Sequence, residues 1–385
     1  MSNWRYVKIG DVCTVERGGS PRPIDKFITV DPNGINWIKI GDTNSSMYIT
    51  QTAQKIIPEG MKKSRYVQPG DFLLSNSMSF GRPYILKIDG CIHDGWLVLR
   101  DNDGIFDKRF LYYYLSSPST YQKFKNMAVG GVVNNLNSEM VRGVTVPVPP
   151  MDEQIDIVTT LDKVTELIAL RKEQLGKLDQ LVKSRFIELF GDPVYNNNGL
   201  PTKKLCELGS LDRGRSQHRP RNDPKLLNGP YPLIQTGEVA SAGLYITEYK
   251  NTYSELGLQQ SKMWKAGTLC ITIAANIAQT AILTFDACFP DSVVGFVPND
   301  AVSAIYMHYW FGFFQKILEE QAPQVAQKNI NLKILSDLDV MVPTKEQQEQ
   351  FAAFVEQTDK SKLAIQKSLD KLELLKKSLM QQYFG

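Results

Sequence analysis

An internal duplication constrains the fold of this chain more than any other feature of its sequence. Segments of the first half recur in the same order in the second half, 196 residues later. At this offset three pairs match: residues 7–12 (VKIGDV) with 203–208 (KKLCEL), 17–20 (RGGS) with 213–216 (RGRS), and 37–42 (WIKIGD) with 233–238 (LIQTGE). Because self-similarity at a fixed period decides how a whole chain folds, any fold must account for two related halves.

The offset drifts by only three residues along the chain. At 197 residues, 69–75 (PGDFLLS) pairs with 266–272 (AGTLCIT), and Asp89, Cys91 and Asp94 fall on Asp286, Cys288 and Asp291. At 194 residues three more pairs match: 134–137 (NNLN) with 328–331 (KNIN), 146–149 (VPVP) with 340–343 (VMVP), and 189–191 (LFG) with 383–385 (YFG). These matches indicate a tandem duplication of a unit of about 190 residues, which is too long for a solenoid repeat.

The first part of each repeat is predicted to be a mixed α/β domain. Short apolar runs bounded by Gly, Pro, Asn and Asp, such as WIKI, DFLL, YILKI and GWLVL, have the length and composition of strands. We expect helices at 110–115 and 121–127, with counterparts in 305–320.

The second part of each repeat is predicted to be one long helix. In residues 151–190 and again in 351–383, mostly apolar side chains recur in alternating steps of three and four, with charged residues between them. This heptad pattern is typical of a coiled coil. Arg171 and Arg185 are polar positions in the first seam. Pro149 and Pro150 mark the start of the first helix, and Gly191 and Pro193 mark its end. A helix of 40 residues is about 60 Å long.

Two such helices in one chain favour an intramolecular antiparallel pair, although a homodimeric coiled coil also fits the heptads alone. Pairing is expected through Leu161, Ile168, Leu175, Leu178, Val355, Ile365, Leu369 and Leu372. The predicted fold class is therefore α/β (α+β), with two mixed domains separated by two long helices. The expected boundaries are 1–149 (domain 1), 150–191 (central helix), 192–344 (domain 2) and 345–385 (C-terminal helix).

Composition excludes several classes of protein. The chain has 385 residues, 42% of them apolar and 22% charged, which is ordinary for a soluble globular protein. Five cysteines without a CxxC pair and three scattered histidines predict neither a disulfide framework nor a metal site. The N-terminus lacks the apolar segment of a secretory signal, and no run is apolar enough to span a membrane, so we expect a cytoplasmic protein.

No complete catalytic motif occurs in the sequence. The string DPVY at 192–195 approaches a motif of adenine methyltransferases, but its third residue is wrong and no glycine-rich cofactor loop precedes it. Walker A, GxGxxG and HExxH strings are absent. We therefore expect a chain that is not catalytic by itself.

Three groups of polar residues are candidates for contacts with nucleic acid. Because the net charge is only +3, a polyanion would have to bind a local patch. Arginine, asparagine and glutamine suit phosphates and base edges, and all three groups recur in both repeats. A solvated loop is the alternative explanation for the arginine loops, and ordinary turns explain the other two groups without any contact to DNA. The groups are the arginine loops (Arg17, Arg22, Lys26; Arg213, Arg215, His218, Arg219, Arg221), a polar loop after a strand (Asn76, Ser77, Arg82; Asn276, Gln279) and an Asn-rich loop (130–137; Gln327, Lys328).

This combination resembles the specificity subunit of type I restriction-modification systems. The resemblance is carried by the two-fold repeat, the VPVP and VMVP segments, the PPMDEQ string that opens the first heptad helix, and the LFG and YFG ends. It covers essentially the whole chain. The second repeat departs from the pattern, with PTKEQQ at 343–348 in place of PPMDEQ.

The resemblance implies a non-catalytic subunit with two target recognition domains, each reading one half of a bipartite target in double-stranded DNA. The two helices would fix the spacing and carry two methyltransferase subunits. The chain itself would bind no cofactor: S-adenosylmethionine would belong to the methyltransferase, and ATP and Mg to two restriction subunits where the system has them. The alternatives are a stand-alone methyltransferase or nuclease, and a coiled-coil scaffold with two ligand-binding domains and no DNA role.

Overall fold

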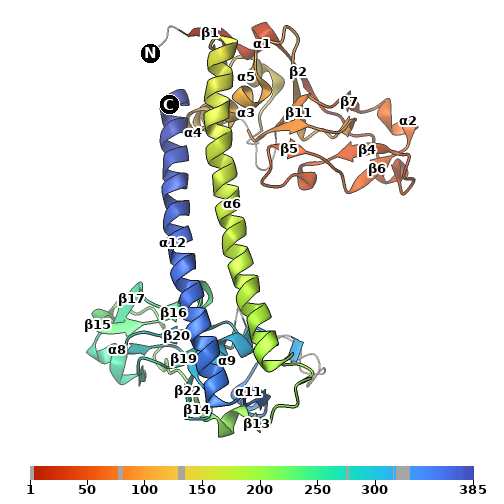
Figure 1. Cartoon of the computed structure of the whole chain (residues 1–385). Coiled ribbons are helices and arrows are strands. Elements are labelled where there is room, and N and C mark those ends of the chain that lie inside the picture. Colours follow the sequence, from red (N-terminus) through yellow and green to blue (C-terminus); the bar gives the residue numbers. More distant parts are fainter. Residues whose placement is uncertain (1–3, 77–80, 129–134, 275–276, 315, 318–329) are drawn as a thin grey trace. The chain divides into compact units, whose positions relative to one another are not determined.

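The chain folds into two compact units (Figure 1), which a computed structural model describes for residues 4–76, 81–128, 135–274, 277–314, 316–317 and 330–385. Unit 1 comprises Met1–Lys172 and Lys367–Gly385, and unit 2 comprises Glu173–Gln366. The boundary between the units falls within the two long helices, because each helix end packs against a different α/β domain. The predicted division at residues 149, 191 and 344 instead treats each long helix as a separate segment.

The described residues of unit 1 form three small sheets. The main sheet has the order β2-β11-β8-β9-β5, in which β5 is parallel to β9 and the other pairs are antiparallel. Its strands are β2 (Cys13–Arg17), β5 (Tyr48–Ile49), β8 (Phe72–Ser75), β9 (Pro83–Leu86) and β11 (Trp96–Asp101). The second sheet, β3-β6-β4-β10-β7, consists of β3 (Ile28–Thr29), β4 (Ile35–Ile38), β6 (Gln54–Ile56), β7 (Arg65–Val67) and β10 (Gly90–Ile92). The third pairs β1 (Arg5–Lys8) with β12 (Thr145–Val148).

Unit 2 repeats this topology, except that its second sheet has no described counterpart of β3. Its main sheet has the order β14-β22-β19-β20-β16, formed by β14 (Gly209–Arg213), β16 (Tyr245–Ile246), β19 (Leu269–Thr272), β20 (Thr280–Leu283) and β22 (Val293–Pro298). The second sheet, β17-β15-β21-β18, consists of β15 (Leu227–Leu233), β17 (Asn251–Tyr253), β18 (Met263–Trp264) and β21 (Ala287–Cys288). The third pairs β13 (Thr202–Lys204) with β23 (Asp339–Met341). The matching strand orders confirm that the sequence repeat is a repeat of fold.

Short helices cover the main sheets, and side chains of the sequence repeat cap several of them. Asn137 accepts a hydrogen bond from the Met140 amide at the start of α5, and Asn331 accepts one from the Ile334 amide at the start of α11. An Asn oxygen at this position satisfies a backbone donor that the helix cannot. The described short helices are α1 (Ile9–Val12), α2 (Pro58–Met61), α3 (Lys108–Ser116), α4 (Pro118–Ala128), α5 (Ser138–Arg142), α7 (Thr236–Ser241), α8 (Glu255–Gln259), α9 (Ala304–Phe311) and α11 (Leu332–Ser336).

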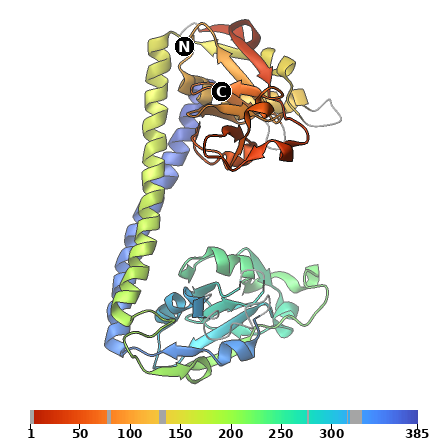
Figure 2. The same cartoon turned by 90° about the vertical axis from the view of Figure 1, so that its right-hand side faces the viewer.

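The long helices are α6 (Met151–Phe190) and α12 (Lys345–Phe384), each of 40 residues. They run side by side within each unit (Figures 1 and 2). In unit 1, Lys172 forms an ion pair with Glu373 at 2.9 Å. In unit 2, Lys362 pairs with Asp179 at 2.7 Å, and the rings of Phe186 and Phe351 lie 5.4 Å apart. Rising numbers on α6 meet falling numbers on α12, so the helices are antiparallel in each unit, as predicted.

Each α/β domain packs against the start of one long helix and the end of the other. In unit 1, Ile157 and Leu161 of α6 share a core with Phe384 of α12, whose ring lies 5.5 Å from that of Phe110. In unit 2, Phe351 of α12 shares a core with Phe190 of α6. Burial of such side chains contributes about 1.5–3 kcal/mol each. Both long helices are therefore part of the core of each unit.

Candidate nucleic-acid interface

The arginine loop of unit 1 follows β2 and is held by the turn after β10. Nε of Arg17 donates to the main-chain oxygen of Asp94 at 3.0 Å. The Asp94 carboxylate accepts hydrogen bonds from Ser20 Oγ at 2.9 Å and from Arg22 Nη2 at 3.5 Å. Burial raises the pKa of Asp94, but the hydrogen bond from the Ser20 hydroxyl and the electrostatic effects of His93 and Arg17 outweigh it and hold the pKa below its usual value. Three side chains of the loop thus donate hydrogen bonds to Asp94.

The arginine loop of unit 2 has the same arrangement around Asp291. Nε of Arg213 donates to the Asp291 main-chain oxygen at 2.9 Å. The Asp291 carboxylate pairs with Arg221 at 2.6 Å and with Arg219 at 3.7 Å. Of the four arginines expected to contact DNA in this unit, three therefore contact the same aspartate, and only Arg215 does not.

Three other residues of the arginine loops are exposed to solvent. His218 pairs with Asp223 at 3.1 Å. Arg215 and Lys26 make no hydrogen bond or ion pair with their side chains within the described part of the chain. Their charges are available to a phosphate without breaking an internal contact.

Asn76 lies in the interior, which differs from its predicted place among surface contacts. Its side chain is 1% exposed, and its Nδ2 donates to the same Asp94 oxygen that accepts from Arg17. A buried amide cannot reach a base edge in this arrangement, so we assign it a role in supporting the Asp94 turn. The neighbouring candidate Ser77 lies outside the described residues, as do Asn276, Gln327 and Lys328.

A hollow of about 750 Å³ adjoins the Asp94 turn in unit 1. Arg22, Lys39 and His93 line it together with the ring of Trp37. Burial lowers the pKa of His93 from its ordinary value, and Asp94 partly opposes this effect. The hollow combines the positive charges of Arg22 and Lys39 with the carboxylates of Asp25 and Asp94, which also line it, and with one aromatic side chain.

The polar loops after β8 and β19 hold their last residues in the same register. Arg82 N donates to Ser75 Oγ, and Gln279 N donates to Thr272 Oγ1, both at 3.0 Å. Both side chains are exposed at the mouths of corresponding cavities, of about 390 Å³ beside Arg82 and about 1010 Å³ beside Gln279. Arg82 thus marks a second candidate site in unit 1, and Gln279 marks the corresponding site in unit 2. Neither residue lines the hollow at the Asp94 turn.

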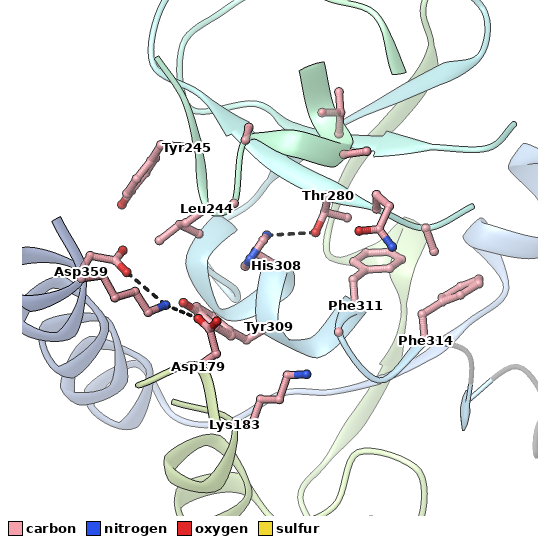
Figure 3. A pocket seen from close by; sticks show the side chains of 18 of the residues that line it. Asp179, Lys183, Leu244, Tyr245, Thr280, His308, Tyr309, Phe311, Phe314 and Asp359 are labelled. Carbon is pink, nitrogen blue, oxygen red and sulfur yellow. Dashed lines mark hydrogen bonds and ion pairs between the residues drawn. The ribbon is translucent and has the colours of Figure 1, made fainter. Parts of the chain in front are cut away.

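The larger cavity, in unit 2, is lined by aromatic side chains of α9 and by charged side chains of the long helices (Figure 3). Lys362 lies between Asp179 at 2.7 Å and Asp359 at 3.6 Å. His308 shares a hydrogen bond of 3.0 Å with Thr280, and burial lowers its pKa to about 4. A histidine that is neutral at pH 7 gives this wall no positive charge with which to hold an anion.

All eight predicted helix-pairing residues are buried or partly buried. Leu161 and Val355 are fully covered, and Leu369 is 5% exposed. Ile168, Leu175, Leu178, Ile365 and Leu372 are half-buried, as expected for two helices that pack without further neighbours. Large apolar side chains also lie exposed on the outer faces: Leu167, Leu170, Leu374 and Leu375 in unit 1, and Leu181, Ile187 and Leu363 in unit 2.

Two pairs of residues that sequence reasoning did not select position these surfaces. Gln154 and Gln348 lock the long helices to their domains, and Asp94 and Asp291 hold the arginine loops. Both pairs lie at the offsets of the repeat, 194 and 197 residues. Recurrence had already marked Asp94 and Asp291 as a matched pair, and the same signal could have found Gln154 and Gln348. Among the described residues no cluster of metal-binding side chains occurs, and no helix is long and apolar enough to cross a membrane.

Comparison with known proteins identifies the family. The model of the type I restriction modification DNA specificity domain matches residues 1–180 and again residues 198–376. The chain belongs to this family. The two matched segments correspond to the two repeats, so each repeat carries one copy of the specificity domain.

Relatives of the specificity family align over most of the chain. A putative type I restriction enzyme MjaX specificity subunit of Methanocaldococcus jannaschii is 22% identical, covering 98% of this chain and 92% of the relative. The EcoBI specificity subunit of Escherichia coli is 22% identical, covering 92% of this chain and 79% of the relative.

Solved structures share the fold. A chain from a study of complex assembly and conformational transition of a type I R-M system has a TM-score of 0.63 at 18% identity, covering 100% of this chain and 98% of that one. The S subunit of a type I system from M. genitalium has a TM-score of 0.55 at 14% identity, covering 100% and 96%. Together with the family match, these neighbours confirm the predicted specificity-subunit fold.

Proposed function

We propose that this specificity subunit reads a bipartite, asymmetric target in double-stranded DNA, one part through each unit. It is the non-catalytic component of a site-specific adenine methyltransferase complex. The observation that carries the proposal is the repeated arginine loop, held by Asp94 in unit 1 and by Asp291 in unit 2. Arginine is the side chain best suited to phosphates and guanine edges, and here it is placed at equivalent points of two domains.

The loops support an asymmetric target because they differ in detail. Unit 1 offers Arg17, Arg22 and Lys26, whereas unit 2 offers four arginines and a histidine. The hollow beside Asp94 has Trp37 and His93 in its wall, and the matching positions of unit 2 are Leu233, 196 residues after Trp37, and Pro290, 197 residues after His93. Two reading surfaces with different side chains favour two different half-sites.

The long helices would set the distance between the half-sites and bind two methyltransferase subunits. A helix of 40 residues is about 60 Å long, against roughly 34–36 Å for one turn of B-DNA. The exposed leucines on the outer faces support a docking role, because large exposed apolar side chains are often covered by a partner protein. S-adenosylmethionine would be bound by those partners. ATP and Mg would be bound by two restriction subunits where the system cuts DNA.

A comparison of methylated adenines in host DNA with and without this gene tests the proposal. Methylation at one bipartite, asymmetric motif should vanish when the gene is deleted and return when it is restored. A methylome that does not change on deletion, in cells that still make the methyltransferase, would falsify the proposal. It would favour a scaffold without a DNA role.

A further inference from the structure

An equivalent hydrogen bond fixes the position of one arginine side chain in each unit. Nε of Arg17 donates to the Asp94 main-chain oxygen at 3.0 Å, and Nε of Arg213 donates to that of Asp291 at 2.9 Å. Nε is the inner donor of the guanidinium group. The two terminal nitrogens of Arg17 and Arg213 make no hydrogen bond within the described residues, so the outer edge of each group is free.

The aspartate carboxylates bind a second set of arginines beside the pinned ones. Asp94 accepts from Arg22 at 3.5 Å, and Asp291 accepts from Arg221 at 2.6 Å. The side chain of Asp94 is 43% exposed and that of Asp291 is 35% exposed. Each carboxylate therefore draws cationic side chains together at a solvent-exposed turn.

Stability does not explain why this arrangement occurs twice. Exposed ion pairs contribute about 0–1 kcal/mol because solvent screens the charges and ordering two long side chains costs entropy. Clustered arginines also repel one another in the absence of a polyanion. Preorganisation explains the arrangement better, because a guanidinium group that is already oriented loses less entropy when it binds.

We propose that Asp94 and Asp291 are positioning residues: the carboxylate of each holds the arginine loop in place, and its main-chain oxygen aims the terminal nitrogens of one arginine, Arg17 or Arg213, at DNA. This inference rests on the proposed function. The outer edge of a guanidinium group offers two parallel donors, which match a planar pair of acceptors. In DNA that pair is O6 and N7 of a guanine or two oxygens of a phosphate, and the chemistry is the same for both.

The test uses the complete complex with its methyltransferase subunits and oligonucleotides that carry the target found in the methylome. Each half-site is replaced in turn, one base pair at a time, and Kd is measured at several salt concentrations. The variants are Arg17→Ala, Arg17→Lys and Asp94→Asn in unit 1, with Arg213→Ala, Arg213→Lys and Asp291→Asn in unit 2. Arg5→Ala, an exposed arginine of β1 outside the arginine loop, serves as the control.

Arg17→Ala and Arg17→Lys should both weaken binding to the half-site of unit 1 by about 5- to 150-fold, because lysine cannot offer two parallel donors. A loss confined to one base position identifies a guanine contact. An equal loss for all sequences, with a salt slope lower by about one, identifies a phosphate contact. Recognition of the other half-site by the same complex should be unchanged, which shows that the variant is folded and assembled.

Asp94→Asn should weaken binding to the same half-site by about fivefold, since a neutral acceptor holds the loop less firmly. In the background of Arg17→Ala and Arg22→Ala, the Asp94 substitution should cause no further loss. A merely structural aspartate would still cost affinity in that background.

The outcomes separate the two proposals. Arg17→Lys and Arg213→Lys with wild-type affinity and base preference would overturn the positioning role while leaving the proposed function intact. A further loss from Asp94→Asn in the arginine-free background would also overturn it. A wild-type complex that binds all DNA sequences equally would overturn the proposed function itself, and this inference with it.

Discussion

Gln154 and Gln348 make the same three hydrogen bonds in the two units. Gln154 accepts from the Asp107 amide at 2.9 Å and donates to the oxygens of Ile105 and Pro149 at 2.9 and 3.0 Å. Gln348 accepts from the Ser303 amide at 2.8 Å and donates to the oxygens of Ala301 and Pro343 at 2.9 and 3.1 Å. The strings PPMDEQ and PTKEQQ differ at most positions, but both end in this glutamine. Each glutamine ties the first turn of a long helix to the segment before a short one.

Gln154→Leu should lower the free energy of unfolding by about 3 kcal/mol, because it leaves three main-chain groups without a partner in a buried site. The urea midpoint of the isolated chain measures this change. Gln357→Leu, at an exposed position of α12, is the matched control and should shift the midpoint little. Equal midpoints for the two variants would contradict the locking role of Gln154.

His308 should make the chain less stable in acid. Burial lowers its pKa in the folded chain to about 4, against about 6.5 when unfolded. Between these values the unfolded histidine binds a proton and the folded one does not, so the free energy of unfolding falls as the pH falls from 6.5 to 4. The full effect is about 3 kcal/mol. The measurement is urea unfolding of the wild type and of His308→Gln at pH 7 and pH 4. If both lose the same stability on acidification, His308 is not the responsible group.

At the scale of elements, the two long helices present a narrow buried seam and an exposed apolar outer face. Leu369 and Leu374 lie five residues apart on α12, but they are 5% and 68% exposed. The same residue type thus serves core packing at one position and remains available to a partner at the other.

Leu369→Asp should destabilise unit 1 by about 3 kcal/mol or more, because it places a charge in the seam and removes apolar packing. Leu374→Asp should change stability by less than about 0.5 kcal/mol, yet weaken binding of the methyltransferase subunit. Thermal unfolding of the isolated chain and co-purification with the partner measure the two effects separately. A Leu374→Asp chain that binds its partner normally would exclude this part of the outer face from the interface.

At the scale of the whole molecule, duplication gives each domain the start of one long helix and the end of the other. Phe190 and Phe384 occupy corresponding positions, 194 residues apart, and each lies in a domain core. Neither repeat alone contains every element that its own domain packs against.

Removing one heptad from both helices, residues 169–175 and 368–374, should change the spacer of the DNA target without changing either half-site. Seven residues shorten each helix by about 10 Å, or about three base pairs, and keep the seam in phase. Methylome sequencing of cells that carry the shortened chain measures spacer and half-sites together. Altered half-sites with the original spacer would contradict the ruler role of the helices.

The sequence by itself determined the architecture of this protein. The ordered matches between its halves predicted two related domains, and heptads with steps of three and four predicted both long helices and their buried positions. These features depend on local periodicity and on similarity between segments, which can be read along one chain. The arginine loops were located for the same reason, because they recur at a fixed offset.

Only the tertiary structure decided what individual polar residues do. Asn76, in a polar loop, is buried beneath the Asp94 turn, and three of the four arginines in the arginine loop of unit 2 are held by Asp291. Asp94 lies 77 positions from Arg17, and Gln154 lies 47 from Asp107, so no local pattern connects them. Hydrogen bonds form between groups that the fold brings within about 3 Å, whatever their separation in sequence. The partner of a polar side chain is therefore a property of the folded chain.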